Sequence, residues 1–344
     1  MSVMDFVLPA ALEAHEPPEA RGVARDGVRM LVAEGDAISH HRFTDLPDVL
    51  RPGDVLIVNT SGTLPAAVAV RDTPFAASKK TLPGAVSADS GGAAAVHFST
   101  ELDDGRWLVE PRGATGRDLP LAGGASVHLD EPYAEGRLWI ATIDPPPPLS
   151  VRDFLYAYGQ PIRYGYVPDR WPLSAYQSVF ATEPGSAEMP SASRPFTDRV
   201  VTRLVSRGVV FAPITLHTGV ASAEAHERPY AERFRVPASS ARLINQATGR
   251  VIAIGTTAVR AVESAVGPDG RVRARQGWTD LVITPARGVR VVDGLLTGFH
   301  EPRASHLDML AAIVDRRVLD RCYTEAIGAG YLWHEFGDVN LLIR

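Results

Sequence analysis

The sequence has little of several features that often announce a function. Its single cysteine, Cys322, excludes an internal disulfide and a metal site built from several thiolates. Only two residues, Lys79 and Lys80, are lysines, and the net charge of −5 gives no overall basic field of the kind that nucleic-acid-binding proteins usually present. No apolar run is long enough to span a bilayer, and the N-terminal segment lacks the basic start and apolar run of a signal peptide. We therefore expect a cytoplasmic protein with no membrane partner and only doubtful affinity for tRNA or DNA.

Motifs for metals and phosphate-bearing cofactors are also missing. The pairs His40-His41 and His334-Glu335 do not have the spacing of metal ligands. Glycines cluster near residues 84–92, but neither the strand nor the lysine of a phosphate-binding loop accompanies them. We expect no metal and no resident cofactor.

Length and patterning predict two domains with an α/β fold. With 344 residues, 45% of them hydrophobic, the chain exceeds one ordinary core. Strand and helix signals alternate in residues 1–60 and 149–344, which favours a mostly parallel sheet layered with helices. Short strands separated by Gly, Pro and Asp fill residues 61–148, which predicts an inserted small antiparallel β-barrel. Four prolines at 145–148 end the insertion as a stiff linker.

The most informative local feature is the stretch VIAIGTTAVRAVESA at residues 251–265. Residues 251–254 read as a buried strand, and residues 258–266 read as a helix with Thr257 as its N-cap. A strand that enters a helix through a Gly-Thr-Thr turn directs free N–H groups and hydroxyls at one spot, which suits a carboxylate or a ribose. A plain strand–turn–helix with a surface pair of Arg260 and Glu263 is the alternative.

Several segments, in the same order, resemble the S-adenosylmethionine:tRNA ribosyltransferase-isomerase family of queuosine biosynthesis. The matching segments are Leu8-Pro9 through Arg21 and residues 41–54, 58–66, 176–186, 215–219, 255–264, 279–285, 293–302 and 336–338. The resemblance covers nearly the whole chain. It implies an α/β domain with an inserted β-barrel, in agreement with the patterning above.

The resemblance also implies an activity. The family transfers and isomerises the ribosyl part of S-adenosylmethionine onto the aminomethyl group of a 7-aminomethyl-7-deazaguanine in tRNA, with release of adenine and methionine. S-adenosylmethionine is then a co-substrate rather than a cofactor. The sulfonium acidifies the 5′ carbon, so the site needs a base, groups for the ribose hydroxyls and a charge partner for the methionine moiety.

The chain departs from the family pattern on the acceptor side. In the loop at 188–197, Ser193 and Pro195 replace a glycine and a histidine, and the loop after His217 is shortened, with only Glu232 kept from its motif. Gly298 replaces an asparagine, and an acid, a lysine and an arginine are missing from residues 59–67. A divergent paralogue that uses a small-molecule acceptor, or none, is therefore an alternative, and a non-catalytic nucleoside- or tRNA-binding protein is a third.

Candidate site residues follow from these motifs. His217, at the end of a predicted strand, is a candidate base, and His300 and Glu263 are further candidate catalytic groups. Each has a structural alternative: a backbone-bonded histidine, a loop-packing histidine and a helix-face ion pair. The candidate substrate-binding residues are Arg194, Phe196, Thr215, Gly255, Thr256, Thr257, Arg260 and Phe299.

Overall fold

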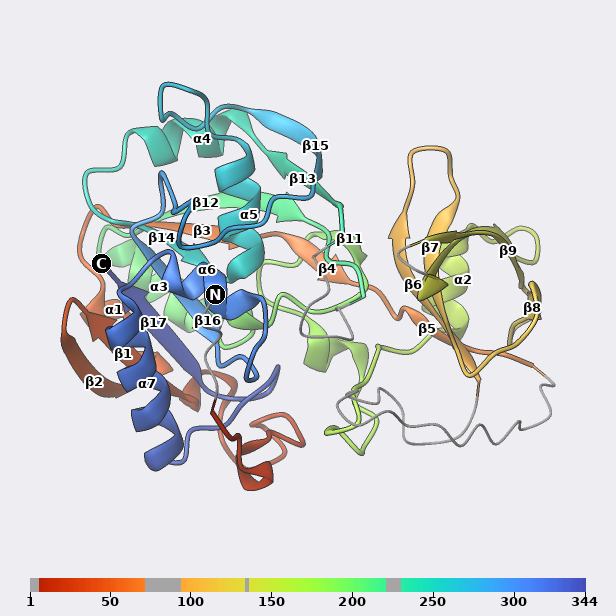
Figure 1. The fold of residues 1–344 in the computed structure, drawn as a ribbon, viewed down its shortest axis with the longest axis horizontal. Helices are drawn as coiled ribbons and strands as arrows, with labels where there is room; N and C mark the ends of the chain where they lie inside the picture. The colour runs from red at the N-terminus through yellow and green to blue at the C-terminus, as the bar shows by residue number, and fades with distance from the viewer. Residues whose placement is uncertain (1–5, 72–93, 134–135, 221–229) are drawn as a thin grey trace.

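The computed structural model describes residues 6–71, 94–133, 136–220 and 230–344, and its fold is built on two sheets that lie side by side (Figure 1). The larger sheet has the strand order β15-β13-β12-β3-β14-β16-β17-β1-β2. Its strands are β1 (Arg29–Glu34), β2 (Ala37–Arg42), β3 (Val55–Asn59), β12 (Val210–Leu216), β13 (Glu232–Val236), β14 (Val251–Ile254), β15 (Arg275–Thr279), β16 (Gly294–Gly298) and β17 (Val339–Ile343).

This sheet is mixed rather than mostly parallel. Its centre, β12-β3-β14-β16, is parallel throughout, and β17 pairs in parallel with β1. The pairs β15–β13, β13–β12, β16–β17 and β1–β2 are antiparallel. The expectation of a mostly parallel sheet therefore holds for the centre and for the β17–β1 pair but not for the sheet as a whole.

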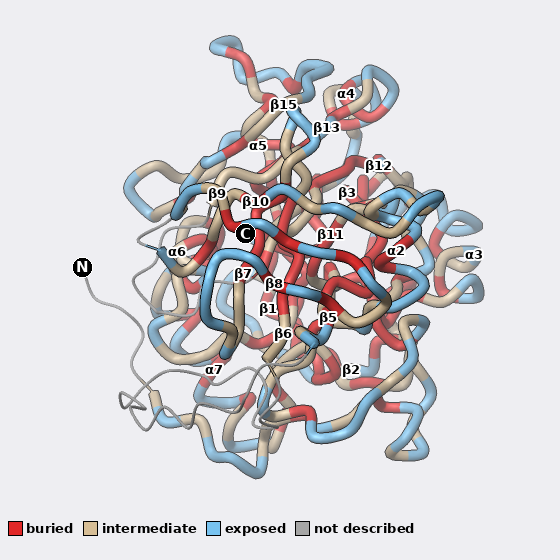
Figure 2. The backbone as a smooth tube through the Cα atoms, turned by 90° about the vertical axis from the view of Figure 1, so that its right-hand side faces the viewer, coloured by how far each residue is buried: buried red, intermediate tan, exposed pale blue. Residues whose placement is uncertain are grey.

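Both faces of the large sheet are buried. Along β3, Val55 and Ile57 belong to one apolar cluster while Leu56 and Val58 belong to another, as the period of two requires. The first cluster contains side chains of α4 (Ala238–Asn245), α5 (Thr256–Ser264), α6 (His306–Ala311) and α7 (Arg316–Gly328). The second contains side chains of α1 (Leu46–Val49) and α3 (Asp198–Ser206). Buried stretches consequently run through the centre of the molecule, and exposed ones lie on peripheral loops (Figure 2).

The smaller sheet is antiparallel, with the order β5-β6-β7-β10-β9-β8. Its strands are β5 (Ala67–Ala69), β6 (Ala95–Glu101), β7 (Trp107–Arg112), β8 (Asp118–Pro120), β9 (Ser126–Tyr133) and β10 (Leu138–Asp144). A bridge between Val70 and Leu121 joins the ends of the two edge strands, so the sheet curls toward a barrel.

Helix α2 (Val151–Tyr158) packs on this curled sheet rather than on the large one (Figure 1). Ser150 and Asp153 form a capping box at its start, which satisfies N–H groups that the helix cannot pair itself. Phe154 and Leu155 are fully buried in the apolar cluster of the smaller sheet, where each contributes about 2 kcal/mol through apolar burial.

A short parallel pair, β4 (Ser61–Thr63) and β11 (Glu183–Ser186), lies where the chain passes between the two sheets (Figure 1). Elsewhere, residues 281–284 are irregular, and residues 312–315 separate helix α6 from helix α7. Asp315 accepts a hydrogen bond from the Arg317 backbone N–H and starts the second helix.

Candidate functional site

A cavity of about 610 Å³ lies where the two sheets meet. The large-sheet side contributes the start of α5 and the loop after β16, and the small-sheet side contributes β6 and β7. Segments 162–166, 187–192 and 334–335 close the remaining walls. A cavity of this size between two domains is the usual setting for a small-molecule site.

The Gly-Thr-Thr turn forms one wall of this cavity. Gly255 has φ = 88°, a value that L side chains rarely adopt, and a Cβ there would lie 3.3 Å from Cβ of Ala192. Helix α5 begins at Thr256, so Gly255 is its N-cap, and the prediction of Thr257 as N-cap is wrong. Thr257 Oγ1 instead accepts a hydrogen bond from Asn59 at 3.3 Å. Thr256 and Thr257 thus present the positive end of the helix to the cavity.

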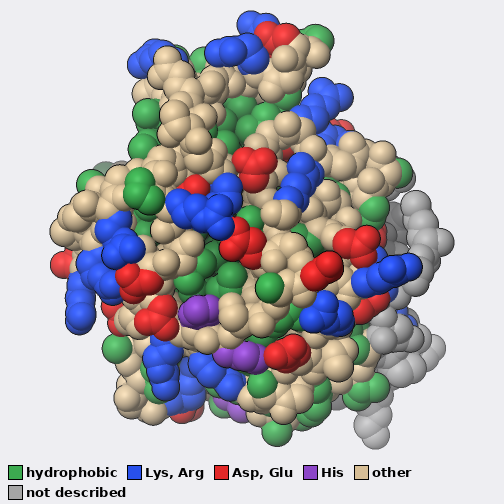
Figure 3. All heavy atoms as spheres, turned by 90° about the vertical axis from the view of Figure 1, so that its left-hand side faces the viewer, with side chains coloured by type: hydrophobic (Ala, Val, Ile, Leu, Met, Phe, Trp, Pro, Cys, Tyr) green, Lys and Arg blue, Asp and Glu red, His purple; other side chains and the backbone are tan. Residues whose placement is uncertain are grey.

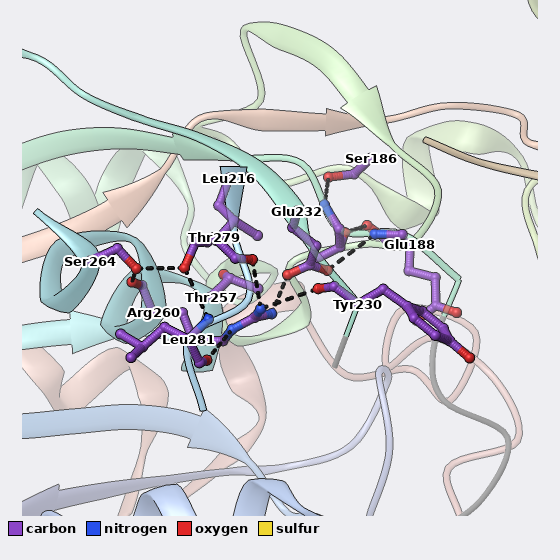
Figure 4. Close-up of polar contacts among 12 residues, drawn as sticks. Ser186, Glu188, Leu216, Tyr230, Glu232, Thr257, Arg260, Ser264, Thr279 and Leu281 are labelled. Atoms are coloured by element: carbon purple, nitrogen blue, oxygen red, sulfur yellow. Dashed lines mark hydrogen bonds and ion pairs between the residues drawn. The ribbon is translucent and has the colours of Figure 1, made fainter. Parts of the chain in front are cut away.

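Arg260, one turn further along α5, is held by a ring of oxygens (Figure 4). Its guanidinium forms an ion pair with Glu232 and donates to the carbonyls of Leu281 at 3.1 Å, Thr279 at 3.2 Å and Tyr230 at 3.4 Å. Burial raises the pKa of Glu232, and the charge of Arg260 opposes this rise. Oxygens of the protein itself therefore bind the Arg260 guanidinium. The ion pair in turn holds the Glu232 carboxylate at the cavity.

The loop after β16 brings two histidines to the cavity. His300 Nε2 lies 3.1 Å from Thr297 Oγ1, and its ring stacks on that of His306 with centroids 4.6 Å apart. Burial lowers the pKa of His300 well below its usual value, and it lowers the pKa of His306 to about 4, although His306 keeps an exposed face toward the cavity. Both imidazoles are neutral at pH 7. Phe299 is buried beside them and packs on Trp333.

An aromatic column forms a further wall. The ring of Tyr166 stacks on that of Tyr164 and on that of His334, with centroids 5.6 and 3.8 Å apart. The Tyr166 hydroxyl donates to Glu335 Oε2 at 2.6 Å, and His334 Nδ1 lies 3.8 Å from Glu301 Oε1. Burial raises the pKa of Glu301, as does the nearby charge of Glu13.

The smaller sheet adds a buried charged cluster to the cavity. Arg112 and Arg137 each donate to Glu110 Oε1 at 2.9 Å, and His97 Nδ1 lies 3.4 Å from its other oxygen. Although burial raises the pKa of Glu110, His97 and the two arginines lower it to about 2. Arg137 also donates to the Tyr230 hydroxyl at 3.2 Å, which ties the smaller sheet to the main body.

Two of the predicted charged residues do not reach the cavity. The side chain of Glu263 is fully buried, and one oxygen accepts the backbone N–H groups of Arg290 and Val291 at 2.8 and 3.0 Å. Arg194 is 2% exposed, pairs with Glu19 at 2.9 Å and donates to the Ala175 carbonyl at 2.9 Å. Both side chains anchor loops.

Phe196, Thr215 and His217 also lie elsewhere. Phe196 is buried in the second apolar cluster, and Thr215 Oγ1 contacts Thr60 Oγ1 at 3.0 Å. His217 faces a separate hollow of about 390 Å³, and its Nδ1 lies 2.7 Å from Ser61 Oγ. Of the predicted site residues, the structure brings together Gly255, Thr256, Thr257, Arg260, Phe299 and His300.

Sequence reasoning did not assign Tyr166, Thr297, Glu301, His306 or His334 to the site. Two residues that line the cavity, Arg303 and His334, have an unusual backbone geometry. They are the non-glycine residues with positive φ in the described ranges. No pattern in the linear sequence reveals such a conformation.

The outer face beside β1, β2 and α7 carries acidic and basic side chains that are intermingled rather than separated (Figure 3). The pairs Arg51–Glu34 and His40–Glu325 exemplify this pattern, with closest charged atoms 2.6 and 2.8 Å apart. This face therefore presents no field of one sign. In the part of the chain that the structure describes, no three His, Cys, Asp or Glu residues are grouped to hold a metal ion. No helix in those ranges has the length and apolar character needed to cross a membrane.

Comparison with known proteins gives one consistent result. The family model described as "Queuosine biosynthesis protein" matches residues 1–342. The S-adenosylmethionine:tRNA ribosyltransferase-isomerase of Gloeobacter violaceus is 33% identical over 98% of this chain and 94% of its own length. The protein of the same name from Symbiobacterium thermophilum is 32% identical over 100% of this chain and 99% of its own. The crystal structure of S-adenosylmethionine tRNA ribosyltransferase from Thermotoga maritima has a TM-score of 0.54 at 25% identity and covers 99% of this chain and 100% of that one.

Proposed function

The chain belongs to the queuosine biosynthesis protein family, and from that premise we propose that it transfers and isomerises the ribosyl group of S-adenosylmethionine onto an aminomethyl-deazaguanine in tRNA. Adenine and methionine are the leaving products. The relatives' names specify tRNA, so they do not bear out the doubt that the net charge raised. A tRNA acceptor implies a cytoplasmic site of action. The proposed domain division remains residues 1–60 plus 149–344 for the catalytic domain and 61–148 for the inserted barrel.

The observation that carries this proposal is the convergence of the helix start at Thr256 and Thr257 with the His300–His306 pair in one cavity. The N–H groups and hydroxyls of the Gly-Thr-Thr turn suit the carboxylate or the ribose hydroxyls of S-adenosylmethionine. Glu232, held by Arg260, supplies negative charge for the ammonium or the sulfonium.

His300 is the proposed base that removes the proton from the 5′ carbon beside the sulfonium. A neutral imidazole can accept a proton, and the depressed pKa keeps His300 neutral at pH 7. Thr297 fixes one ring nitrogen, and the stack against His306 fixes the plane of the ring. His306 and Thr297 are thus positioning residues in this scheme.

A second candidate is the same chemistry on a small-molecule acceptor. The observation that favours it is the pairing of the arginines around the cavity and the adjoining hollow, because a guanidinium already bound to a carboxylate attracts RNA phosphates less. Arg112 and Arg137 pair with Glu110, and Arg233 pairs with Asp103 at 2.6 Å.

Mass spectrometry of the reaction products tests both candidates. The protein is incubated with S-adenosylmethionine alone, with free 7-aminomethyl-7-deazaguanine, or with an anticodon stem-loop RNA that bears this base. Adenine release together with a mass gain on the RNA supports the first candidate, and product on the free base alone supports the second. No adenine in any reaction, with S-adenosylmethionine bound, contradicts both and leaves a binding protein.

A further inference from the structure

The wall formed by Tyr166, Glu301 and His334, the acceptor wall, holds polar groups that the protein leaves unused. The His334 side chain is only 5% exposed, and its Nε2 has no hydrogen-bond partner among the described residues. A buried polar atom without a partner costs about 1–3 kcal/mol. His334 also has φ = 72°, a further cost for a residue with a side chain. Free-energy costs of this kind are found at sites that are preorganised to bind a ligand.

The Glu301 carboxylate is the second unused group. It accepts no hydrogen bond from the described residues, its side chain is 39% exposed, and His334 Nδ1 lies 3.8 Å from Oε1. Burial and the charge of Glu13 both raise the pKa of Glu301. A cation placed beside these two carboxylates is therefore attracted by both.

The third element is the column of Tyr164, Tyr166 and His334, whose rings lie within 15° of parallel in successive pairs. Flat heteroaromatic rings stack on aromatic side chains with about 1–3 kcal/mol per base. The column and Glu301 line the same cavity as the Gly-Thr-Thr turn. A ring bound here can therefore reach a second substrate bound at the turn.

We propose that the acceptor wall is the acceptor subsite and that it selects a flat heteroaromatic ring carrying a protonated amine. This inference rests on the proposed function. The ring packs on the column, the amine pairs with Glu301, and a ring nitrogen of His334 bonds to the edge of the heterocycle. A free base and a base within RNA share this chemistry, and they are separated by the two forms of the probe below.

Equilibrium binding of paired ligands tests this subsite. The ligands are 7-aminomethyl-7-deazaguanine and its 7-cyano analogue, which keeps the ring but lacks the amine, each as the free base and within an anticodon stem-loop RNA. In at least one form, the unaltered protein should prefer the aminomethyl ligand by about tenfold or more, as expected for one charge-assisted hydrogen bond. Glu301→Gln should abolish this preference, and His334→Phe, which keeps a ring for stacking, should weaken both ligands alike.

Glu325→Gln is the matched control, because Glu325 also lies beside a histidine, His40 at 2.8 Å, but outside the cavity. It should keep the full preference. Equal binding of the two ligands by the unaltered protein, binding of neither, or a preference that survives Glu301→Gln overturns the subsite. Adenine release from S-adenosylmethionine is measured in parallel. Transfer without ligand preference refutes the subsite alone, whereas ligand preference without transfer refutes the proposed reaction alone.

Discussion

Two walls of one cavity differ in how far the protein satisfies its own polar groups. On the donor wall, formed by Gly255, Thr256, Thr257 and Arg260, the one charged side chain is bound to Glu232 and to three backbone carbonyls. On the acceptor wall, a histidine nitrogen and a carboxylate lack partners among the described residues.

The donor wall is therefore a preformed surface, whereas the acceptor wall is a surface whose polar contacts a ligand completes. A satisfied network keeps its geometry without substrate, which reduces the entropy lost on binding. Unpaired groups lower stability in the free protein but strengthen selection, because only a ligand with matching polar groups relieves them.

The largest effect is expected from His300→Gln, at the junction of the two walls. If His300 is the base, kcat should fall by about 100-fold or more, while the dissociation constant of S-adenosylmethionine changes little. Steady-state kinetics of adenine release and a binding titration provide the two numbers. His128→Gln, on the exposed side of the smaller sheet, serves as the control. A loss of binding equal to the loss of rate would make His300 a binding residue instead.

The pH dependence of stability should reflect histidines whose pKa values are lowered by folding. Folding lowers the pKa of His306 and of His334 to about 4, so the unfolded chain binds more protons than the native protein between about pH 6.5 and 4. Stability should therefore fall as pH decreases through this window, by up to about 3 kcal/mol for the nearly buried His334.

The rate of adenine release should follow the same direction, since His300 stays neutral well below pH 6.5. We expect kcat to be level from pH 8 to pH 6.5, with its acid limb well below pH 6.5. Thermal unfolding and kcat measured across this range check both statements. An acid limb centred near 6.5 would show that an ordinary, solvated histidine controls the reaction.

A smaller effect is expected from Gly255→Ala on the donor wall. The backbone conformation of Gly255, with φ = 88° and ψ = 155°, is essentially limited to glycine, and the change should cost about 1–3 kcal/mol of stability. It should also raise KM for S-adenosylmethionine several-fold, because the turn must shift. Gly270→Ala, with φ = 75° in a turn outside the cavity, should affect stability without affecting KM. Equal KM values in the two variants would remove the turn from the donor site.

The smallest effect is expected from His217→Gln, although the sequence favours this histidine as a base. Its ring faces the separate hollow and contacts Ser61, and a Cβ at Gly185 would lie 2.5 Å from the ring, so the position is tightly packed. We expect kcat to change by less than about threefold, with a modest loss of stability. A loss of kcat comparable to that of His300→Gln would restore His217 as the base.

Local patterns predicted the donor wall because it is contiguous in sequence. The strand at Val251–Ile254 has the predicted bounds, and the turn lies where the Gly-Thr-Thr pattern indicates. Helix α5 begins two residues before the predicted start because Gly255, with its positive φ, caps it in place of Thr257. Periodicity locates such elements well, but it does not fix their ends.

Tertiary contacts determine the parts of the site that local patterns did not predict. The partner of Arg260 is Glu232 on strand β13, so the alternative of a surface pair with Glu263, three residues away, does not hold. The acceptor wall joins Tyr166 to His334 across most of the second half of the chain. Its members come from irregular segments, whose positions no periodic pattern encodes.

The dissociation constant of S-adenosylmethionine, measured by calorimetry for the unaltered protein, Thr256→Val and Glu301→Gln, tests the division into two walls most directly. Thr256→Val keeps the shape of the side chain and removes its hydroxyl at the start of α5. The account predicts that Thr256→Val weakens binding by about tenfold, while Glu301→Gln leaves it within about twofold. If Glu301→Gln weakens binding and Thr256→Val does not, the cationic donor lies on the wall assigned to the acceptor, and the account is contradicted.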